Sequence, residues 1–321
     1  MKRLALVSSL LLCVLAAGPA LGQERILAVT GGAANGATDA GAVGEIDPMS
    51  GAFTALNVPV PGSGLTGLAS TTDGRLFAVT NGAQSSEPPV LIELDPTTGA
   101  LIQTVGQILD PTGAPVYLQD LALQPGTNTL YGAVAFVGGD TEGGQGNGNG
   151  GVTEGGDGQN ALVTIDLGTA EITEIGLPDF GGIEGGYVAI AFTPDGTLWG
   201  KDTNESNLFT LDPSDASVLT TQTITALGGG LGGLGLGSGS DGRLYLSECC
   251  DNTTGNDIYT LDTNTLEATL LGPAGADRRV HDFIIAGAPV SILDIPTLGE
   301  WGLLALLVLL AGAGIVFVRR R

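Results

Sequence analysis

The sequence predicts an all-β protein, a five-bladed β-propeller closed by a C-terminal strand, and three observations lead to this prediction. The first is composition: glycine is abundant (54 of 321 residues), and lysine is nearly absent. The apolar residues are mostly Leu, Ile, Val and Ala, which is typical of short strands joined by glycine turns. The second is an internal repeat, and the third is a spare strand at the end of that repeat.

The repeat is most visible as an aspartate that ends an apolar strand. It occurs five times, at Asp47, Asp95, Asp166, Asp212 and Asp262. The preceding residue is always Ile or Leu and the one before that is Glu or Thr, the inside–outside alternation of a half-buried strand. A turn follows, as in the segment 95–99 (Asp-Pro-Thr-Thr-Gly), where we expect the aspartate side chain to cap the turn and glycine to take the left-handed exit.

A second signature precedes most copies: a turn and then an apolar–aromatic pair, as in Asp73-Gly74-Arg75-Leu76-Phe77. A small-residue strand comes before it, and a fourth strand follows the aspartate turn. Where no insertion intervenes, the aspartates are 46 to 50 residues apart. Four strands with this period are typical of a propeller blade.

The first copy starts at its second strand, residues 25–30, and lacks an innermost strand. The segment 280–285 is a strand without a blade of its own. Placing it in the first blade completes five blades and removes an open edge. The alternatives are a six-bladed ring, which needs a unit absent from the sequence, and a flat array of hairpins, which leaves both ends unpaired.

Segments outside the repeat define the domain boundaries. Residues 1–22 read as a signal peptide, with Lys2 and Arg3 before an apolar stretch and a small-x-small cleavage site at residues 20–22. The propeller is expected at 23–287, with a flexible acidic glycine-rich loop at 138–160, and a linker at 288–294.

The C-terminal segment 295–321 predicts the location of the protein. Residues 301–318 form one uncharged apolar run, and three arginines follow it, Arg319, Arg320 and Arg321. Eighteen helical residues span about 27 Å, enough to cross a bilayer as a transmembrane helix. The arginines act as a membrane stop and place the C-terminus in the cytoplasm, so the body lies outside. An ordinary membrane anchor would show the same run and stop.

A short motif stands before this run. Its residues are Ile295, Pro296, Thr297, Leu298, Trp301 and Gly302. Motif, helix and arginines in this order resemble the IPTL-CTERM sorting tail, a relative of PEP-CTERM found on exported proteins of Gram-negative bacteria. The resemblance implies cleavage by an exosortase-type membrane protease and transfer of the body to the cell surface.

Charge excludes one class of partner. The body, residues 23–294, carries six basic and 33 acidic residues, a net charge of −27. Such a body repels phosphate backbones, so nucleic-acid binding is excluded, and cations or a basic partner are the favoured ligands.

Few residues suggest site chemistry. Aligning the innermost strands by their apolar core residue places Asp120 and Asp282 at equivalent positions, where they are candidate ligands for Ca²⁺ if they face the channel; solvated carboxylates are the simpler interpretation. Cys249 and Cys250 are adjacent and predict either a vicinal disulfide or two free thiols. A serine triad would have to use the single histidine, His281, and no Gly-x-Ser-x-Gly turn exists.

The sequence therefore predicts a surface-sorted propeller that acts as a binding or extracellular-matrix protein and is not an enzyme. Its ligand would be a surface polymer or a protein, and no cofactor is required beyond the candidate Ca²⁺. Two alternatives stay open: a calcium-dependent hydrolase of the lactonase type, and a passive structural spacer.

Overall fold

The strands of the described chain form four-stranded antiparallel sheets. The computed structural model describes residues 25–31, 40–56, 64–80, 88–113, 116–136, 161–180, 187–202, 206–224, 233–248, 256–275 and 280–286. These residues form five sheets, which we number as blades 1 to 5. The strands of each blade are given from the innermost outward. Blade 1 is β20 (Val280–Ala286), β1 (Arg25–Thr30), β2 (Val43–Ile46) and β3 (Phe53–Ala55), and blade 2 is β4 (Leu65–Ser70), β5 (Leu76–Thr80), β6 (Val90–Leu94) and β7 (Leu101–Gln107). Blade 3 is β8 (Val116–Leu123), β9 (Leu130–Phe136), β10 (Ala161–Ile165) and β11 (Ile172–Gly176); blade 4 is β12 (Tyr187–Phe192), β13 (Leu198–Asp202), β14 (Asn207–Leu211) and β15 (Val218–Thr223); and blade 5 is β16 (Gly233–Ser238), β17 (Leu244–Glu248), β18 (Asp257–Leu261) and β19 (Ala268–Pro273).

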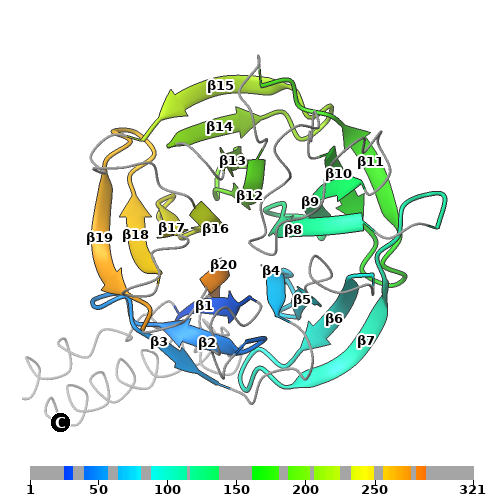
Figure 1. Cartoon of the computed structure of the whole chain (residues 1–321), viewed down its shortest axis with the longest axis horizontal. Coiled ribbons are helices and arrows are strands. Elements are labelled where there is room, and N and C mark those ends of the chain that lie inside the picture. Colours follow the sequence, from blue (N-terminus) through cyan, green and yellow to red (C-terminus); the bar gives the residue numbers. More distant parts are fainter. Residues whose placement is uncertain are drawn as a thin grey trace, which may run out of the picture. The chain divides into compact units, whose positions relative to one another are not determined.

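The blades stand around a common axis, with the innermost strand of each at the centre and the fourth at the rim (Figure 1). The innermost strands contact one another in the order β20, β4, β8, β12, β16 and back to β20. The five-bladed propeller predicted from the repeat is therefore confirmed. Residues Glu24–Ala286 make up this single unit.

The C-terminal strand closes the ring. β20 pairs antiparallel with β1, from Arg25 opposite Ala286 to Thr30 opposite Val280. Blade 1 thus takes its innermost strand from the end of the body and its other strands from the beginning, as the spare strand predicts. The closure leaves no innermost position empty in the ring.

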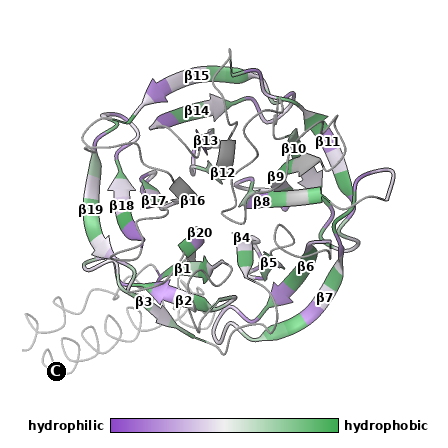
Figure 2. Ribbon diagram, viewed as in Figure 1, coloured by the Kyte–Doolittle hydropathy of each residue, from purple (hydrophilic) through white to green (hydrophobic). Residues whose placement is uncertain are grey.

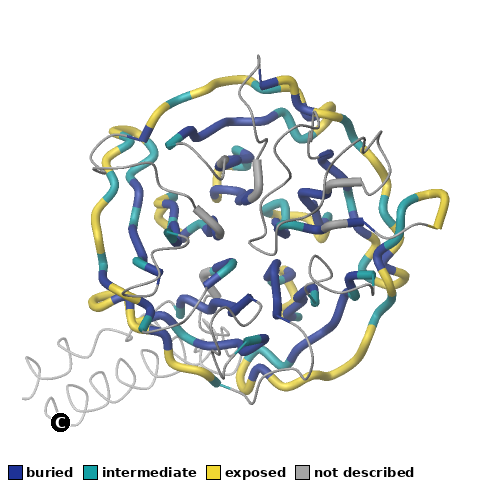
Figure 3. The backbone as a smooth tube through the Cα atoms, in the orientation of Figure 1, coloured by how far each residue is buried: buried dark blue, intermediate teal, exposed yellow. Residues whose placement is uncertain are grey.

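The hydrophobic core lies between the blades. The buried apolar residues of the described chain form five clusters, each shared by two adjacent blades. The aromatic residue that opens the second strand packs toward the next blade, as Phe77, Tyr131 and Trp199 do. Inner strands are mostly hydrophobic and buried, whereas the rim strands are largely exposed (Figures 2 and 3).

Every innermost strand carries a β-bulge at the same place. One extra residue interrupts the pairing with the second strand in each blade; these residues are Thr66, Gln119, Val188, Leu234 and His281. A bulge changes the direction of the side chains that follow it. The residue after each bulge is the aligned position that holds glycine, alanine or aspartate, so these five positions are structurally equivalent.

The aspartate turns have the predicted geometry. In all five copies the carboxylate accepts a hydrogen bond from the N–H two residues later, for example Thr97 to Asp95 at 2.8 Å. The residue four positions after the aspartate takes a positive φ in each turn. Two of these five are glycines, and the others are Ala170, Ala216 and Leu266, so the glycine exit expected from the sequence holds in only part of the ring.

Candidate functional site

Asp282 follows the bulge of β20 and is completely buried. Its Oδ2 accepts a hydrogen bond from the backbone N–H of Leu68 in β4, at 2.5 Å. Its Oδ1 accepts from the N–H of Phe283, at 2.6 Å. The carboxyl group therefore joins the closing strand of blade 1 to the innermost strand of blade 2.

Asp120 occupies the equivalent position in β8 and is also completely buried. Its Oδ2 accepts from the N–H of Ile190 in β12, at 2.8 Å, and its Oδ1 accepts from the N–H of Leu121, at 2.9 Å. This contact joins blade 3 to blade 4 in the same way that Asp282 joins blade 1 to blade 2.

The two carboxyl groups also form a hydrogen bond with each other. Burial raises the pKa of Asp120 well above its usual range, and the charge of Asp282 raises it further. Burial likewise raises the pKa of Asp282, although the hydrogen bond from Asp120 acts in the opposite direction. The structure thus brings together the two aspartates singled out in the sequence, 162 positions apart, as a buried pair.

A calcium ion at Asp120 and Asp282 stays a prediction. Calcium needs six to eight oxygen ligands, and each of the four carboxyl oxygens here already accepts a backbone N–H. Among the residues that the structure describes, no three His, Cys, Asp or Glu side chains lie close enough together to hold a metal ion.

A second site, which the sequence did not suggest, lies between blades 4 and 5. It is a cavity of about 560 Å³. It is formed by the β12–β13 turn, the β16–β17 turn and the β18–β19 turn, all at one end of the blades. Its lining includes Asp195, Trp199, Arg243, Asp262 and Asn264.

The carboxylates of this cavity are held by local hydrogen bonds. The N–H groups of Asn264 and Thr265 hold the pKa of Asp262 below its usual value, and Arg243 lowers it further. The hydroxyl of Thr193 is the largest cause of the lowered pKa of Asp195. Both groups are therefore ionised at neutral pH and act only as acceptors.

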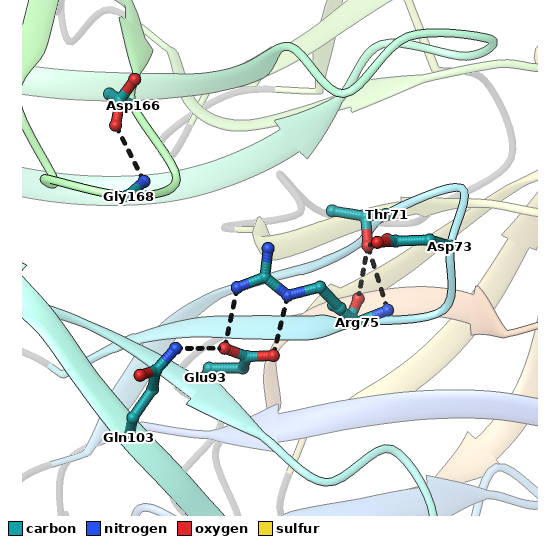
Figure 4. Close-up of polar contacts among 7 residues, drawn as sticks. All are labelled: Thr71, Asp73, Arg75, Glu93, Gln103, Asp166 and Gly168. Atoms are coloured by element: carbon teal, nitrogen blue, oxygen red, sulfur yellow. Dashed lines mark hydrogen bonds and ion pairs between the residues drawn. The ribbon is translucent and has the colours of Figure 1, made fainter.

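Arg243 differs from its counterpart in blade 2, Arg75. Arg75 donates from Nε and Nη2 to the two carboxylate oxygens of Glu93, both at 2.8 Å (Figure 4). Its guanidinium lies 4.7 Å from the centre of the Phe77 ring. In blade 5, the position of Glu93 is held by Thr260. Both residues stand directly before the final Leu of the third strand.

Without that acidic partner, Arg243 forms an ion pair with Asp241 at 3.4 Å, in which both side chains are more than half exposed. The repeat itself contains the signal that reveals this, because Asp-Gly-Arg occurs in blades 2 and 5 whereas blade 5 lacks the glutamate that blade 2 has. The side chain of Arg243 thus lines the cavity and is largely exposed there.

Other residues singled out in the sequence lie outside the described residues. These are the signal peptide at 1–22, Cys249 and Cys250, the loop at 138–160, the linker at 288–294 and the tail at 295–321. His281 is described and lies half buried in β20. Within the described ranges, no helix is both long and apolar enough to cross a membrane.

Fold and tail together define the class of protein: a five-bladed propeller that ends in a sorting tail. The tail is identified as the IPTL-CTERM motif, which matches residues 295–321. This motif implies a protein that is exported, processed by an exosortase-type sorting system and directed to the cell surface. No curated protein matches the chain.

Solved structures similar to this chain include three with low sequence identity. Hydrazine synthase from Kuenenia stuttgartiensis is 14% identical, with 69% of this chain and 50% of that chain covered and a TM-score of 0.37. A protein of unknown function from Bacteroides caccae is 10% identical (82% and 74% covered, TM-score 0.40). Virginiamycin B lyase from Staphylococcus aureus is 16% identical (77% and 71% covered, TM-score 0.40). The match spans about half the length of the hydrazine synthase chain.

Proposed function

We propose that this protein is a ligand-binding propeller displayed at the cell surface, and that its ligand site is the cavity between blades 4 and 5. The sorting tail supports the location. The observation that carries the binding role is the polar lining of the cavity. In that lining, Arg243 has no glutamate partner, whereas its counterpart in blade 2, Arg75, pairs with Glu93.

The lining favours a neutral polymer rich in hydroxyl groups, such as a polysaccharide. Asp195 and Asp262 accept hydrogen bonds from hydroxyls, and Arg243 donates to hydroxyl or ring oxygens. Three carboxylates against one guanidinium leave the cavity with net negative charge, since Asp241 also lines it. That charge disfavours uronic acids and other anionic polymers.

The cavity volume fits an oligosaccharide segment. At about 560 Å³ it lies within the range of roughly 300 to 1,000 Å³ usual for small-molecule sites. Most such sites have apolar linings, whereas this one combines charged groups with amide and hydroxyl groups from Asn264, Ser240 and Thr263. A hydroxyl-rich ligand matches that difference.

Binding is favoured over hydrolysis by the burial of the axial aspartates. A calcium-dependent hydrolase would use Asp120 and Asp282, and neither has any exposed surface. The cavity lining, in contrast, includes the exposed side chains of Asp241 and Arg243. The passive spacer differs from our proposal in requiring no ligand at all.

The test is titration calorimetry of the full-length chain in mild detergent with cellotetraose, maltotetraose and mannotetraose. We expect at least one to bind, and we expect Asp262→Asn and Arg243→Gln each to weaken that binding about tenfold, by removing one charge-assisted hydrogen bond. Asp166→Asn is the matched control, because Asp166 caps the same turn in blade 3 away from the cavity.

Three results would overturn the proposal. One is the absence of binding for all three sugars at millimolar concentration. Another is equal weakening by the control variant, because the effect would then come from the turn. The third is tighter binding of oligolysine of similar length, which would point to a basic protein partner. Surface labelling of cells that express the chain with or without residues 295–321 tests the display itself.

A further inference from the structure

The buried aspartate pair at the axis has a role that ligand binding does not use. A hydrogen bond between two carboxyl groups needs a proton, because two carboxylates have only acceptors. The other hydrogen bonds of Asp120 and Asp282 all come from backbone N–H groups, which are donors. None of these contacts can accept the proton that lies between the two carboxyl groups. One proton is therefore shared by the pair.

The contacts of the pair extend around more than half of the inner ring. Asp282 links β20 to β4, and Asp120 links β8 to β12. Between them, the hydroxyl of Thr66 in β4 donates to the carbonyl of Leu118 in β8, at 3.2 Å. The strands β20, β4, β8 and β12 are thus joined by side-chain contacts, and the carboxyl pair connects the first of these strands to the third.

The other neighbour of β20, the strand β16, approaches it closely at two glycines. A Cβ placed on Gly235 of β16 would lie 2.5 Å from the carbonyl oxygen of His281, and one placed on Gly237 would lie 2.5 Å from that of Phe283. The closing strand is therefore in direct backbone contact on one side and held by the Asp282 carboxyl on the other.

We infer that Asp120 and Asp282 form a proton-dependent clasp, in which one shared proton holds the closing strand β20 in the ring. Loss of that proton leaves two negative charges at hydrogen-bond distance in a site that excludes water. Their repulsion, undiminished by solvent, drives the two inner strands apart and weakens ring closure.

The direction of the pH effect follows from proton binding. The pair keeps its proton in the folded chain, whereas in the unfolded chain aspartates lose it near pH 4. Stability is therefore greatest on the acidic side and falls as the pH rises from about 4 through the elevated pKa of the pair. In that window the unfolding constant rises up to tenfold for each pH unit.

Few other titratable groups stand on the elements around the pair. β4 and β16 carry none. The others are Tyr117 on β8, Tyr131 on β9, Tyr187 on β12, Arg25 and Glu45 on blade 1, Tyr245 and Glu248 on β17, Lys201 and Asp202 on β13, and His281 on β20. His281 is the one histidine of the chain, and histidine is the side chain whose unperturbed pKa lies between pH 5 and pH 8, so His281→Gln serves as the background for every variant.

Two measurements on the full-length chain in mild detergent test the clasp. Infrared difference spectroscopy at pH 7 should show the carbonyl band of a protonated carboxylic acid, which weakens in Asp120→Asn. Urea unfolding at pH 5 and pH 8 should show a larger unfolding constant at pH 8, by up to about a thousandfold over three pH units, and a smaller change with pH in Asp120→Asn, where only the burial of Asp282 still raises a pKa. Glu248→Gln removes a carboxyl group outside the pair, and this variant should keep the pH dependence of the unmodified chain.

The infrared band keeps the inference falsifiable if Asp120→Asn does not fold. Absence of the band in the unmodified chain would show that no proton is shared. An equal pH dependence in Asp120→Asn would assign the effect to other groups. Native mass spectrometry supplies a third outcome against the clasp: one calcium ion bound per chain, lost in Asp120→Asn, would mean that a cation takes the place of the proton. None of these outcomes depends on whether the cavity binds a sugar.

Discussion

The ion pair between Arg75 and Glu93 gives a prediction whose size can be worked out. Arg75 holds the Glu93 carboxylate with two hydrogen bonds, and the amide of Gln103 adds a third at 2.6 Å. These contacts, Arg75 first, lower the pKa of Glu93 from 4.5 to about 2. Glu93→Gln removes the charge and keeps the size of the side chain.

The expected loss follows from that pKa with a correction for solvent. A fall of the Glu93 pKa from 4.5 to about 2 can contribute at most about 3.4 kcal/mol to the free energy of unfolding. The side chain of Glu93 is 10% exposed, but that of Arg75 is 39% exposed, so water screens the pair. We therefore expect Glu93→Gln to lower the free energy of unfolding by about 1 to 2 kcal/mol at pH 7.

The sign of the pH dependence is opposite to that of the axial pair. A lowered pKa means that the contribution is present above about pH 4.5 and is lost as the pH falls toward 2. Urea unfolding at pH 7 and pH 3 should therefore show a smaller difference between the variant and the unmodified chain at pH 3.

Glu45 provides the matched control, because it occupies the same place in blade 1, pairs with Arg25 and is 40% exposed. Glu45→Gln should lower the free energy of unfolding by less than about 1 kcal/mol. Equal losses in the two variants, or a loss from Glu93→Gln that does not change with pH, would refute the reasoning.

Two further substitutions probe close packing and the cavity. Gly235→Ala places a methyl group against the backbone of β20 and should lower the free energy of unfolding by at least about 2 kcal/mol; Gly74→Ala, at φ +85° with no atom nearby, should cost about 1 kcal/mol, and similar losses for both would contradict the packing argument. Thr260→Glu gives Arg243 the partner that Arg75 has, so urea unfolding should show a free energy of unfolding higher by about 0.5 kcal/mol. Sugar titration should show weaker binding to this variant. Unchanged binding would mean that Arg243 is not part of the ligand site.

Most of the fold could be predicted from the sequence because a propeller repeats its local signals. The aspartate turn, the apolar–aromatic pair and the regular spacing each depend on residues close together in the chain. The missing inner strand of blade 1 and the spare strand at 280–285 then determined the closure. Only the described part of this prediction is confirmed; the signal peptide and the helix of residues 301–318 stay predictions.

The site was less accessible to sequence reasoning, for physical reasons. Alignment of the inner strands found Asp120 and Asp282, but their hydrogen bonds reach Ile190 and Leu68 in neighbouring blades, and the contacts exist only once the ring is formed. The five bulges leave no clear mark in the sequence, although they direct these side chains. The cavity likewise combines turns from two blades.

The closing strand also has a mechanical consequence. Ala286, its last residue, pairs with Arg25, the first residue of β1, so the two ends of the propeller leave the ring at adjacent positions. Only residues 287–294 separate Ala286 from the sorting motif at 295–321. Tension on the tail would therefore reach β20 first, at its Ala286 end, and would peel its hydrogen bonds from β1 one after another. Blades 2 to 5 would bear load only after β20 had left the ring, so blade 1 sets the mechanical strength of the attached protein.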